Sequence, residues 1–227
     1  MYNNKKILGI ITARGGSKGI PRKNIQILSG KPLIAWTIIE AQKSQYIDKI
    51  ILSSDDKEII DISKQWGCEV PFVRPKKFAK DDTSSVIPVL HAVQQLPGFD
   101  YIVLLQPTSP LRSVEDIDGC IDLCFQKNSN ICVSVTSSTI NSFLLCKITK
   151  SLCLEPFLQE GFIPRRQDTP ELYIINGAVY VAKIDWLKQT QSFLTPETMA
   201  YVMPQIRSLD IDTELDMKIC EQLLKNI

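Results

Sequence analysis

Short apolar runs alternate with segments of helical spacing along most of the chain. Lys6–Ala13, Lys49–Ser54 and Tyr101–Gln106 are apolar and rich in β-branched residues, which is typical of buried strands. Between them, Pro32–Ser44 and Ser84–Gln95 carry apolar residues at helical spacing. Strands that alternate with helices of roughly 10–15 residues predict βαβ units. We therefore expect an α/β fold built on a mostly parallel sheet.

The same rhythm predicts the remaining elements. A helix follows Asp55 or Asp56, either of which can cap it, and the helix ends at Gly67. The pattern further predicts a third strand at Glu69–Arg74, a helix from Ser113, strands over 130–135, 172–182 and around Tyr201, a helix near Trp186 and a last helix from Thr213.

The rhythm changes between Thr136 and about Pro170. Short alternating pieces such as FLLCKIT and the polar loop FIPRRQDTP replace the alternation of strands and helices there. We expect residues 1–136 and 171–227 to form the main domain. Residues 137–170 are then an inserted lobe that serves dimerisation or substrate binding.

Composition excludes several broad classes of function. The chain has 227 residues, a formal net charge of +1, 44% hydrophobic and 22% charged residues, as ordinary globular proteins do. The near-neutral balance argues against a nucleic-acid coat or a polybasic membrane anchor, so any positive site is local. The apolar run at 7–13 is too short for a signal peptide, and no stretch approaches the roughly 20 residues of a membrane span. We expect a cytoplasmic protein.

The seven cysteines and the single histidine give no sign of a metal or nucleophile site. No C-x-x-C pair is present, and His91 has no second histidine to complete a zinc site. We expect reduced, mostly buried thiols and a structural histidine.

The stretch ITARGGSKGIPRKN (11–24) gathers cations on a flexible segment directly after the first predicted strand. The loop Gly15-Gly16-Ser17 lets the backbone approach a ligand closely, and consecutive amides can form an anion-binding nest. Arg14 and Lys23 are the cations expected to bind a polyphosphate, with Lys18 and Arg22 as weaker candidates. The spacing fits neither a Walker A loop nor G-x-G-x-x-G, which points away from P-loop NTPases and dinucleotide-binding dehydrogenases. A solvated turn is the alternative.

Two further loops lie at the ends of predicted strands, where open α/β sheets bind their ligands. In RPKKFAKDDTSS (74–85), Arg74 is a candidate ligand, with an ordinary salt bridge as the alternative, and Thr83 and Ser85 are candidates that can also cap the next helix. In LLQPTSPLR (104–112), two prolines fix a rigid polar loop in which Gln106 offers a donor and acceptors. Thr108 and Ser109 share that loop, which can also be a plain strand-to-helix turn.

The last two candidate stretches lie in the C-terminal part of the chain. Asn176 and Gly177 interrupt an apolar strand, which suggests a bulge or a close approach to a ligand. In SLDIDTELD (208–216), an extended backbone projects Asp210 and Asp212 from one face, roughly 7 Å apart, where Mg²⁺ could bridge them to substrate phosphates. A capping role is the alternative for Asp212, and Thr213-x-x-Asp216 has the pattern of a capping box.

With these stretches assembled, the chain resembles the cytidylyltransferases that make CMP-sialic acids, including the N-acylneuraminate, legionaminic and pseudaminic acid enzymes. The matching stretches are ARGGSKGIPRKN, LLQPTSPLR, RRQDTPELYIINGAVYV and DIDTELD, which run from residue 13 to 216. The resemblance implies a Rossmann-like nucleotidyltransferase fold, a homodimer and an inserted dimerisation lobe. It also implies a role in making lipopolysaccharide or capsule sugars.

The resemblance assigns roles to matching positions of this chain. Arg14, Lys23 and Asn24 would contact the phosphates of CTP, and Arg74 and Ser85 would lie near the cytidine. Mg²⁺ would be held by Asp210 and Asp212. The residues that would face the sugar acid are Gln106, Arg166, Asn176 and Tyr180. The arginine pair in PRRQDTP departs from the neuraminate pattern, so Arg165 could take the place of Arg166.

The implied reaction is attack of the sugar's anomeric hydroxyl on the α-phosphorus of CTP, with release of pyrophosphate. Two alternatives remain: activation of the eight-carbon acid Kdo by the same chemistry, and a glycosyltransferase whose D-x-D motif binds a metal. INGAVY and DIDTELD favour nine-carbon acids over Kdo. The sequence does not distinguish neuraminic, legionaminic and pseudaminic acids.

Overall fold

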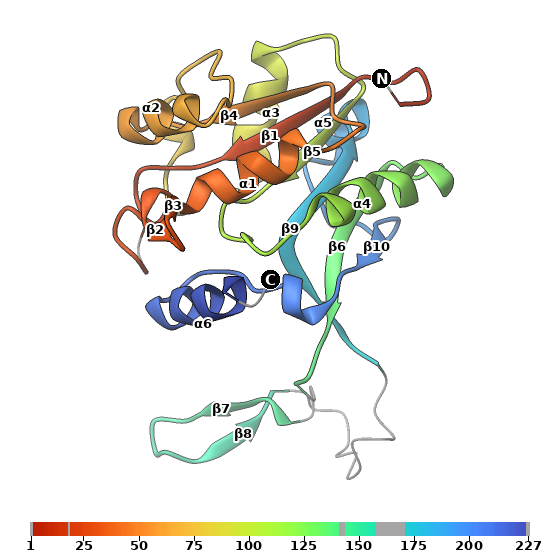
Figure 1. Cartoon of the computed structure of the whole chain (residues 1–227). Coiled ribbons are helices and arrows are strands. Elements are labelled where there is room, and N and C mark those ends of the chain that lie inside the picture. Colours follow the sequence, from red (N-terminus) through yellow and green to blue (C-terminus); the bar gives the residue numbers. More distant parts are fainter. Residues whose placement is uncertain (1, 18, 141–143, 158–170, 226–227) are drawn as a thin grey trace.

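A central six-stranded sheet runs through the part of the chain that the structure describes (Figure 1). The structure is a computed structural model, and it describes residues 2–17, 19–140, 144–157 and 171–225. The strand order is β10-β6-β9-β5-β1-β4. These strands span Met199–Val202 (β10), Ile131–Ser137 (β6), Tyr173–Lys183 (β9), Tyr101–Leu105 (β5), Ile7–Thr12 (β1) and Lys49–Ser53 (β4). All run parallel except β9, which is antiparallel to both of its neighbours.

Helices cover both faces of this sheet. The α-helices are α1 (Leu33–Gln42), α2 (Lys57–Gln65), α3 (Val86–Gln95), α4 (Val114–Gln126), α5 (Ile184–Thr190) and α6 (Glu214–Leu224). Short pieces complete the described chain: η1 (Lys23–Ile25), β2 (Ile27–Leu28), β3 (Lys31–Pro32), η2 (Lys76–Phe78), β7 (Cys146–Ile148), β8 (Leu154–Pro156) and η5 (Gln205–Arg207). The expected α/β class with a mostly parallel sheet is confirmed.

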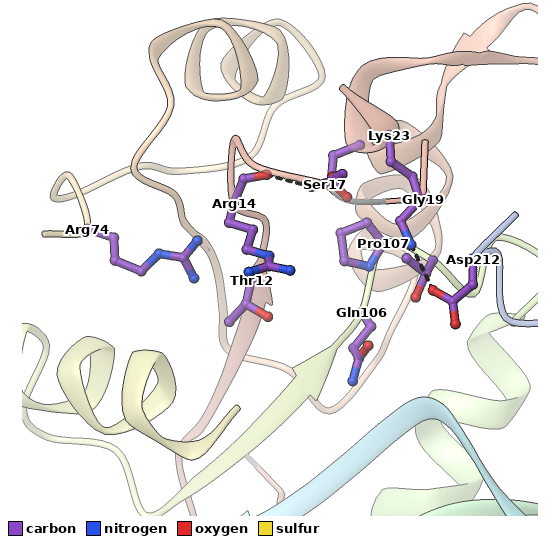
Figure 2. A pocket seen from close by; sticks show the side chains of 11 residues that line it. Thr12, Arg14, Ser17, Gly19, Lys23, Arg74, Gln106, Pro107 and Asp212 are labelled. Atoms are coloured by element: carbon purple, nitrogen blue, oxygen red, sulfur yellow. Dashed lines mark hydrogen bonds and ion pairs between the residues drawn. The ribbon is translucent and has the colours of Figure 1, made fainter. Parts of the chain in front are cut away.

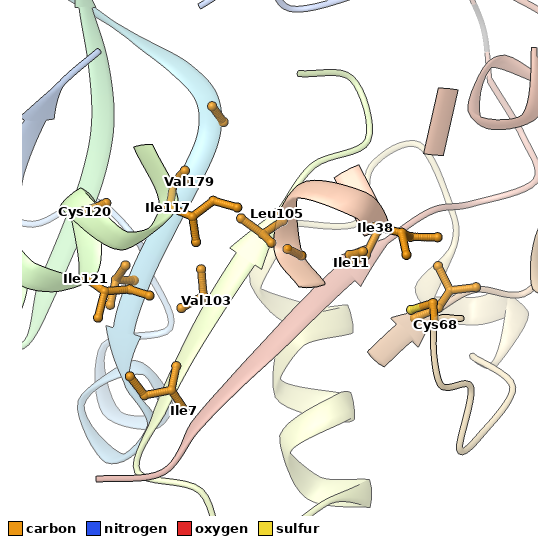
Figure 3. Packing of buried hydrophobic residues seen from close by; sticks show 14 of the residues in the cluster. Ile7, Ile11, Ile38, Cys68, Val103, Leu105, Ile117, Cys120, Ile121 and Val179 are labelled. Carbon is orange, nitrogen blue, oxygen red and sulfur yellow. The ribbon is translucent and has the colours of Figure 1, made fainter. Parts of the chain in front are cut away.

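The two faces of the sheet form separate cores because successive side chains of a strand point to opposite sides. Ile7 and Ile11 of β1 pack with α1, α2 and α4 on one face, where Figure 3 shows Ile38 of α1 and Ile117 of α4. Leu8 and Ile10 pack with α3 and α5 on the other face. The strand is therefore apolar at nearly every position, which explains why it reads as a continuous run.

A third apolar cluster brings the C-terminal helix to the first loop of the chain. Ile20 packs in this cluster with Leu28 and Leu33, and Ile211 and Cys220 join them from the C-terminal part. This packing holds the segment at 208–216 beside the loop that follows β1. Two stretches that are far apart in sequence thus meet at one end of the sheet.

One predicted strand is absent from the described chain. Glu69–Arg74 makes only an isolated bridge between Glu69 and Ile51, so the prediction of a third strand there was wrong. Pro71 lacks the N–H that a ladder needs, and the chain leaves the edge of the sheet at that point. Arg74 is instead held by its backbone N–H, which donates to the Ser54 carbonyl at 2.8 Å.

The segment between β6 and β9 forms a hairpin apart from the sheet, in the part that the structure describes. Strands β7 and β8 pair only with each other and extend away from the main body (Figure 1). The division into 1–136, 137–170 and 171–227, and the role of the lobe, stay predictions. Five cysteines are buried free thiols as expected, whereas Cys146 and Cys153 on this hairpin are free but exposed.

Helix termini follow the local sequence. Asp56 is the residue that caps α2, since its carboxylate accepts from the Ile59 N–H at 3.0 Å. Thr213 and Asp216 form the predicted capping box at the start of α6. Across the described residues, the longest apolar helical stretch falls short of what a bilayer crossing requires.

Candidate nucleotide-binding site

A polar cavity of about 300 Å³ lies at the carboxyl ends of β1 and β5 (Figure 2). This is the edge at which parallel α/β sheets bind ligands. The predicted loops after β1 and β5 and the loop before α6 all reach it. Its lining residues are Thr12, Arg14, Ser17, Gly19, Lys23, Asn24, Arg74, Gln106, Pro107, Thr108 and Asp212.

Two guanidinium groups lie near each other at this cavity. Figure 2 shows the Arg74 side chain pointing toward Arg14, whose own side chain runs down toward Thr12. Arg74 is only 4% exposed, and burial lowers its pKa from the ordinary value; the charge of Arg14 lowers it further, whereas Asp55 opposes the shift. Arg14 forms an ion pair with Asp81 at 2.5 Å. A fold that holds two like charges together at a cavity provides a site for an anionic ligand.

Aspartates at the end of β4 fix the first part of the basic loop. The Asp55 carboxylate accepts from the Gly15 N–H at 3.2 Å and from Arg74 Nη2 at 3.3 Å. A Cβ at Gly15 would come 2.7 Å from an oxygen of Asp56, so any larger residue here would displace the side chain that caps α2. The Gly15 N–H is therefore already bonded to Asp55, whereas a Cβ added to Gly16 would have no neighbouring atom within 4 Å.

Of the other polar residues of the loop, one anchors the loop to the protein and another lines the cavity. Arg22 has left-handed backbone (φ 57°) and pairs bidentately with Asp56 and also with Glu58, which makes it an anchor of the loop. Asn24 is buried, lines the cavity and donates to the Arg14 carbonyl at 3.1 Å. Lys18 lies outside the described residues.

Lys23 joins the basic loop directly to the acidic loop. Its Nζ donates to the Ile211 carbonyl at 2.7 Å and to the Asp212 carboxylate at 3.0 Å (Figure 2). A Cβ added to Gly19 would lie 2.3 Å from the carbonyl oxygen of Asp212, so the backbones of the two loops are in contact. The Ile211 N–H also donates to the Thr108 carbonyl at 2.8 Å, which ties the acidic loop to the loop after β5.

Asp210 is a carboxylate with an unsatisfied oxygen. Its Oδ1 is buried and has no hydrogen-bond partner among the described residues. Burial raises the pKa of Asp210, the nearby charge of Asp212 raises it further, and a hydrogen bond from Thr108 and the charge of Lys23 oppose this. A Cβ on Gly177 would lie 3.7 Å from Asp210 Oδ2 and 3.8 Å from Gln106 Oε1, so these groups converge. An unpaired buried carboxylate oxygen beside a second carboxylate is a donor set that suits a divalent cation.

The expected capping alternative for Asp212 is not what the structure shows. Thr213 is the N-cap of α6, and Asp216 completes the capping box, so Asp216 is structural as expected. The side chain of Asp212 is 73% exposed and is directed to Lys23.

The remaining candidates, Ser85 for the cytidine and the others for the acceptor, separate into three places. Gln106 and Thr108 line the main cavity, whereas Ser109 of the same loop is buried. Ser85 and Tyr180 line a second cavity of about 200 Å³ together with Phe193. Arg165 and Arg166 lie outside the described residues.

Asn176 does not reach either cavity. It lies in a bulge of β9, where the register against β6 shifts and Gly177 has φ 72°, as the interrupted strand predicted. Its amide accepts from Ser134 Oγ at 2.6 Å and donates to Ser208 Oγ at 2.9 Å. These internal hydrogen bonds satisfy the buried amide, and the expected contact of Asn176 with the sugar acid stays a prediction.

Thr83 lines neither cavity; its N–H donates to the Lys80 carbonyl at 3.2 Å within the loop before α3. His91 packs its ring against Phe72 and Phe78, in keeping with the expected structural role. Sequence reasoning missed Thr12, Gly19 and Pro107 as lining residues. Their position at the strand ends was a usable signal, but direction into the cavity depends on packing.

This geometry suits an enzyme that positions a polyphosphate and a second substrate. The fold and the site together define a nucleotidyltransferase. Comparison with known proteins narrows the class. The model of the cytidylyltransferase family matches residues 8–213, and the chain belongs to this family.

Several relatives align over nearly the whole chain. A CMP-N,N'-diacetyllegionaminic acid synthase from Legionella pneumophila is 34% identical over 226 residues, covering 97% of each chain. A pseudaminic acid cytidylyltransferase from Campylobacter jejuni is 34% identical over 225 residues, again covering 97% of each. The N-acylneuraminate cytidylyltransferase of Escherichia coli is 32% identical over 94% of this chain and 51% of its own length.

Solved structures confirm the nucleotidyltransferase fold. A CMP:2-keto-3-deoxy-manno-octonic acid synthetase complexed with CTP aligns with a TM-score of 0.75 at 14% identity, covering 97% of this chain and 99% of that one. A 4-diphosphocytidyl-2C-methyl-D-erythritol synthase from Anaerococcus prevotii aligns with a TM-score of 0.66 at 17% identity, over 97% and 96%. At these identities the likeness concerns the fold alone.

Proposed function

We propose that this cytidylyltransferase joins the CMP group of CTP to a nine-carbon sugar acid of the sialic acid type. The bond forms between the anomeric oxygen and the α-phosphorus, and the bond to the β-phosphate oxygen breaks, so pyrophosphate leaves. The observation that carries the proposal is the direct link, through Lys23 and Gly19, between a cationic wall and a carboxylate wall of one cavity. Relatives named for legionaminic and pseudaminic acids support the choice of acceptor.

The cationic wall would bind the triphosphate. Arg14 would exchange Asp81 for a phosphate oxygen, and charge-assisted contacts of this kind are among the stronger hydrogen bonds in proteins. Lys23 would exchange its contact with Asp212 for a contact with the phosphates as negative charge develops on them. Arg74, which is already held by Asp55, would serve the cytidine end of the nucleotide. Transfers of this type depend mainly on positioning and charge neutralisation.

The carboxylate wall would bind Mg²⁺ through Asp210 and Asp212. The unsatisfied Oδ1 of Asp210 fits such a role, and no group of three metal-ligating side chains occurs among the described residues, so phosphate oxygens would complete the ligands. When bound, the ion would neutralise phosphate charge and polarise the bond to be broken. Gln106 and Thr108 would orient the acceptor beside these carboxylates.

The sugar acid would extend from Gln106 toward the second cavity, which Ser85 and Tyr180 line. Arg166, or Arg165 in its place, remains our candidate for binding the sugar carboxylate. We also propose a homodimer formed through the lobe at 137–170. Exposed apolar side chains on and beside the hairpin support this, because large exposed patches mark interaction surfaces; they include Leu144, Ile148, Leu154 and Phe157. Use of CTP favours a cytoplasmic location and a role in surface-sugar biosynthesis.

The proposal is tested by mixing the protein with CTP, Mg²⁺ and each of a panel of acids, and measuring pyrophosphate. The panel contains N-acetylneuraminic, diacetyllegionaminic and pseudaminic acids, with Kdo as the eight-carbon alternative. We expect release with at least one nine-carbon acid and little with Kdo. Release with Kdo alone would move the proposal to the alternative acceptor. No release with any acid, together with cleavage of a nucleotide sugar, would overturn it in favour of glycosyl transfer.

A further inference from the structure

Arg112 is a charged side chain sealed inside the protein beneath the cavity. It is 1% exposed and is the largest fully buried side chain in the described chain. Burial lowers its pKa to about 10, while the charges of Asp116 and Glu40 oppose the shift, so the guanidinium is charged at neutral pH. Burying an arginine costs considerable free energy, and packed apolar residues often stabilise a fold as well or better. The groups that this buried charge hydrogen-bonds are therefore the place to look for its role.

The guanidinium holds three elements together at the acceptor side of the site. Its Nη1 donates to the Gln106 carbonyl at 3.2 Å and to the Ala178 carbonyl at 2.8 Å. Its Nη2 donates to Thr37 Oγ1 at 2.7 Å, and that hydroxyl donates in turn to the Gln106 carbonyl at 3.3 Å. The end of β5, the bulged part of β9 and helix α1 are thus fastened through one planar group.

The residues fastened in this way are neighbours of the groups that converge on the acceptor. Gln106 lines the cavity, and Ala178 directly follows Gly177, beside which the Gln106 side chain and the Asp210 carboxylate lie. Gln106 follows the end of β5, and Ala178 lies in the bulged part of β9, while the Gln106 carbonyl also accepts from the Ser109 N–H at 3.4 Å. A single fork of N–H donors sets the distance between the Gln106 and Ala178 carbonyls, which a flexible or shorter side chain cannot reproduce.

We propose that Arg112 is a positioning residue, which sets the placement of Gln106 against Gly177 and Asp210 and thereby the rate of transfer to the acceptor. This inference rests on the proposed function. Arg112 contacts no residue of the cationic wall in the described structure, so its effect falls on the acceptor and not on CTP affinity.

The test compares Arg112→Lys and Thr37→Val with the wild-type enzyme. Arg112→Lys keeps the charge but cannot span both carbonyls and the hydroxyl, so kcat/KM for the sugar acid falls about 10–100-fold, since small misplacements are costly in catalysis. Thr37→Val removes one of the three attachments and gives a smaller fall of about 3–10-fold. In both variants the calorimetric Kd for CTP stays within about threefold, because Arg14 and Lys23 are untouched.

A double-variant cycle separates positioning from plain structural support. If Arg112 acts through Gln106, Arg112→Lys adds little to the loss already caused by Gln106→Ala, whereas independent effects multiply. Arg207→Lys is the matched control, since Arg207 pairs bidentately with buried Asp116 at 2.7 and 2.8 Å and contacts neither carbonyl. We expect Arg207→Lys to lower Tm while kcat/KM for the sugar acid stays unchanged.

The inference is overturned if Arg112→Lys leaves kcat/KM unchanged, if it weakens CTP binding as much as acceptor turnover, or if its loss multiplies with that of Gln106→Ala. A wild-type protein that releases no pyrophosphate would instead defeat the proposed function, which is a separate result. Should Arg112→Lys fail to fold, Thr37→Val carries the same comparison, because valine matches the volume of threonine.

Discussion

The basic loop at 14–24 and the acidic loop at 208–216 meet at one cavity, which Asp212 lines and Asp210 adjoins without lining it, but the two loops are built differently. Most contacts of the basic loop are made with other carboxylates: Arg22 with Asp56, Arg14 with Asp81, and the Gly15 amide with Asp55. Within the described residues, the acidic loop leaves one oxygen of Asp210, Oδ1, without a hydrogen bond, and the exposed Asp212 carboxylate pairs with the amine of Lys23. The cations are thus mostly held by carboxylates outside the acidic loop, while one buried carboxylate oxygen has no partner. This difference supports our proposal that a bound metal ion completes the acidic wall.

The largest effect is expected at Asp210. Asp210→Asn removes the unsatisfied charge, and kcat/KM should fall at least about 100-fold, because charge stabilisation is a large part of such catalysis. Burial raises the pKa of Asp210 in the folded state, so the ionised carboxylate opposes folding and stability decreases as pH rises through its titration. The variant should therefore keep or raise Tm at pH 8 while losing activity. Pyrophosphate assays and thermal unfolding at pH 5 and pH 8 check both parts.

Asp212→Ala is the matched comparison within the acidic wall. Its exposed side chain contributes little to folding, so Tm should barely change while kcat drops steeply. A loss of stability that parallels the loss of activity in either variant would show that the acidic loop is structural.

The contact between the two walls can be broken at Gly19. In Gly19→Ala the new Cβ meets the Asp212 carbonyl, and the loops must move apart, which should lower kcat/KM about 10–100-fold and also lower Tm. Gly16→Ala is the stability control, since its Cβ meets no protein atom within 4 Å. Unchanged kinetics and Tm in Gly19→Ala would contradict the close contact of the walls.

A smaller effect is expected at Arg14. Arg14→Ala loses one charge-assisted phosphate contact, which should cost about 1.5–3 kcal/mol in CTP binding or transition-state stabilisation. Steady-state kinetics with varied CTP measure this. Exposed Lys76 serves as the control, and Lys76→Ala should leave the kinetics of CTP within about twofold. Equal kinetics for wild type and Arg14→Ala would remove Arg14 from the nucleotide site.

The smallest effect concerns the frame of the basic wall. Asp56→Asn keeps an oxygen that can cap α2 but removes the charge that pairs with Arg22, and should cost about 1 kcal/mol of unfolding free energy at pH 7. Arg22 lowers the pKa of Asp56, so the ionised form is favoured in the folded state and this stabilisation is lost as pH falls through the folded pKa. The difference from wild type should therefore shrink in acid. Denaturant unfolding at pH 7 and pH 3 measures it, with exposed Asp61→Asn as control. A difference that grows in acid would reverse this interpretation.

Much of the fold was predictable from interactions between residues that are close together in the sequence. The apolar run of β1, the cap at Asp56 and the capping box of Thr213 and Asp216 depend on neighbours in sequence, and the structure confirms them. The strand expected at Glu69–Arg74 failed at Pro71, which lacks the N–H that a ladder needs. The antiparallel direction of β9 was not predictable, because it depends on pairing with strands that are distant in sequence.

For the site, the sequence predicted which loops contribute to it but not the direction of their side chains. The charges of Arg14 and Lys23 and the carboxylates of Asp210 and Asp212 were visible as opposite clusters in the sequence. The direction of a side chain was not visible: Asn176 turns inward, and Arg112 is buried where an exposed surface charge is the usual expectation. Asn176 and Ala178, whose carbonyl accepts from Arg112, both lie where the register of β9 against β6 shifts.

The most direct test of the claim that both walls bind one metal–triphosphate is calorimetric titration of CTP with and without Mg²⁺. It compares the wild type with the variant carrying Asp210→Asn and Asp212→Asn. The wild type should bind CTP at least about tenfold more tightly with Mg²⁺ than without it, as expected if carboxylates and phosphates share the ion. In the double variant the two affinities should be equal, with CTP still bound through the cationic wall. The same Mg²⁺ dependence in both proteins would contradict the claim that the acidic wall completes a metal–triphosphate site.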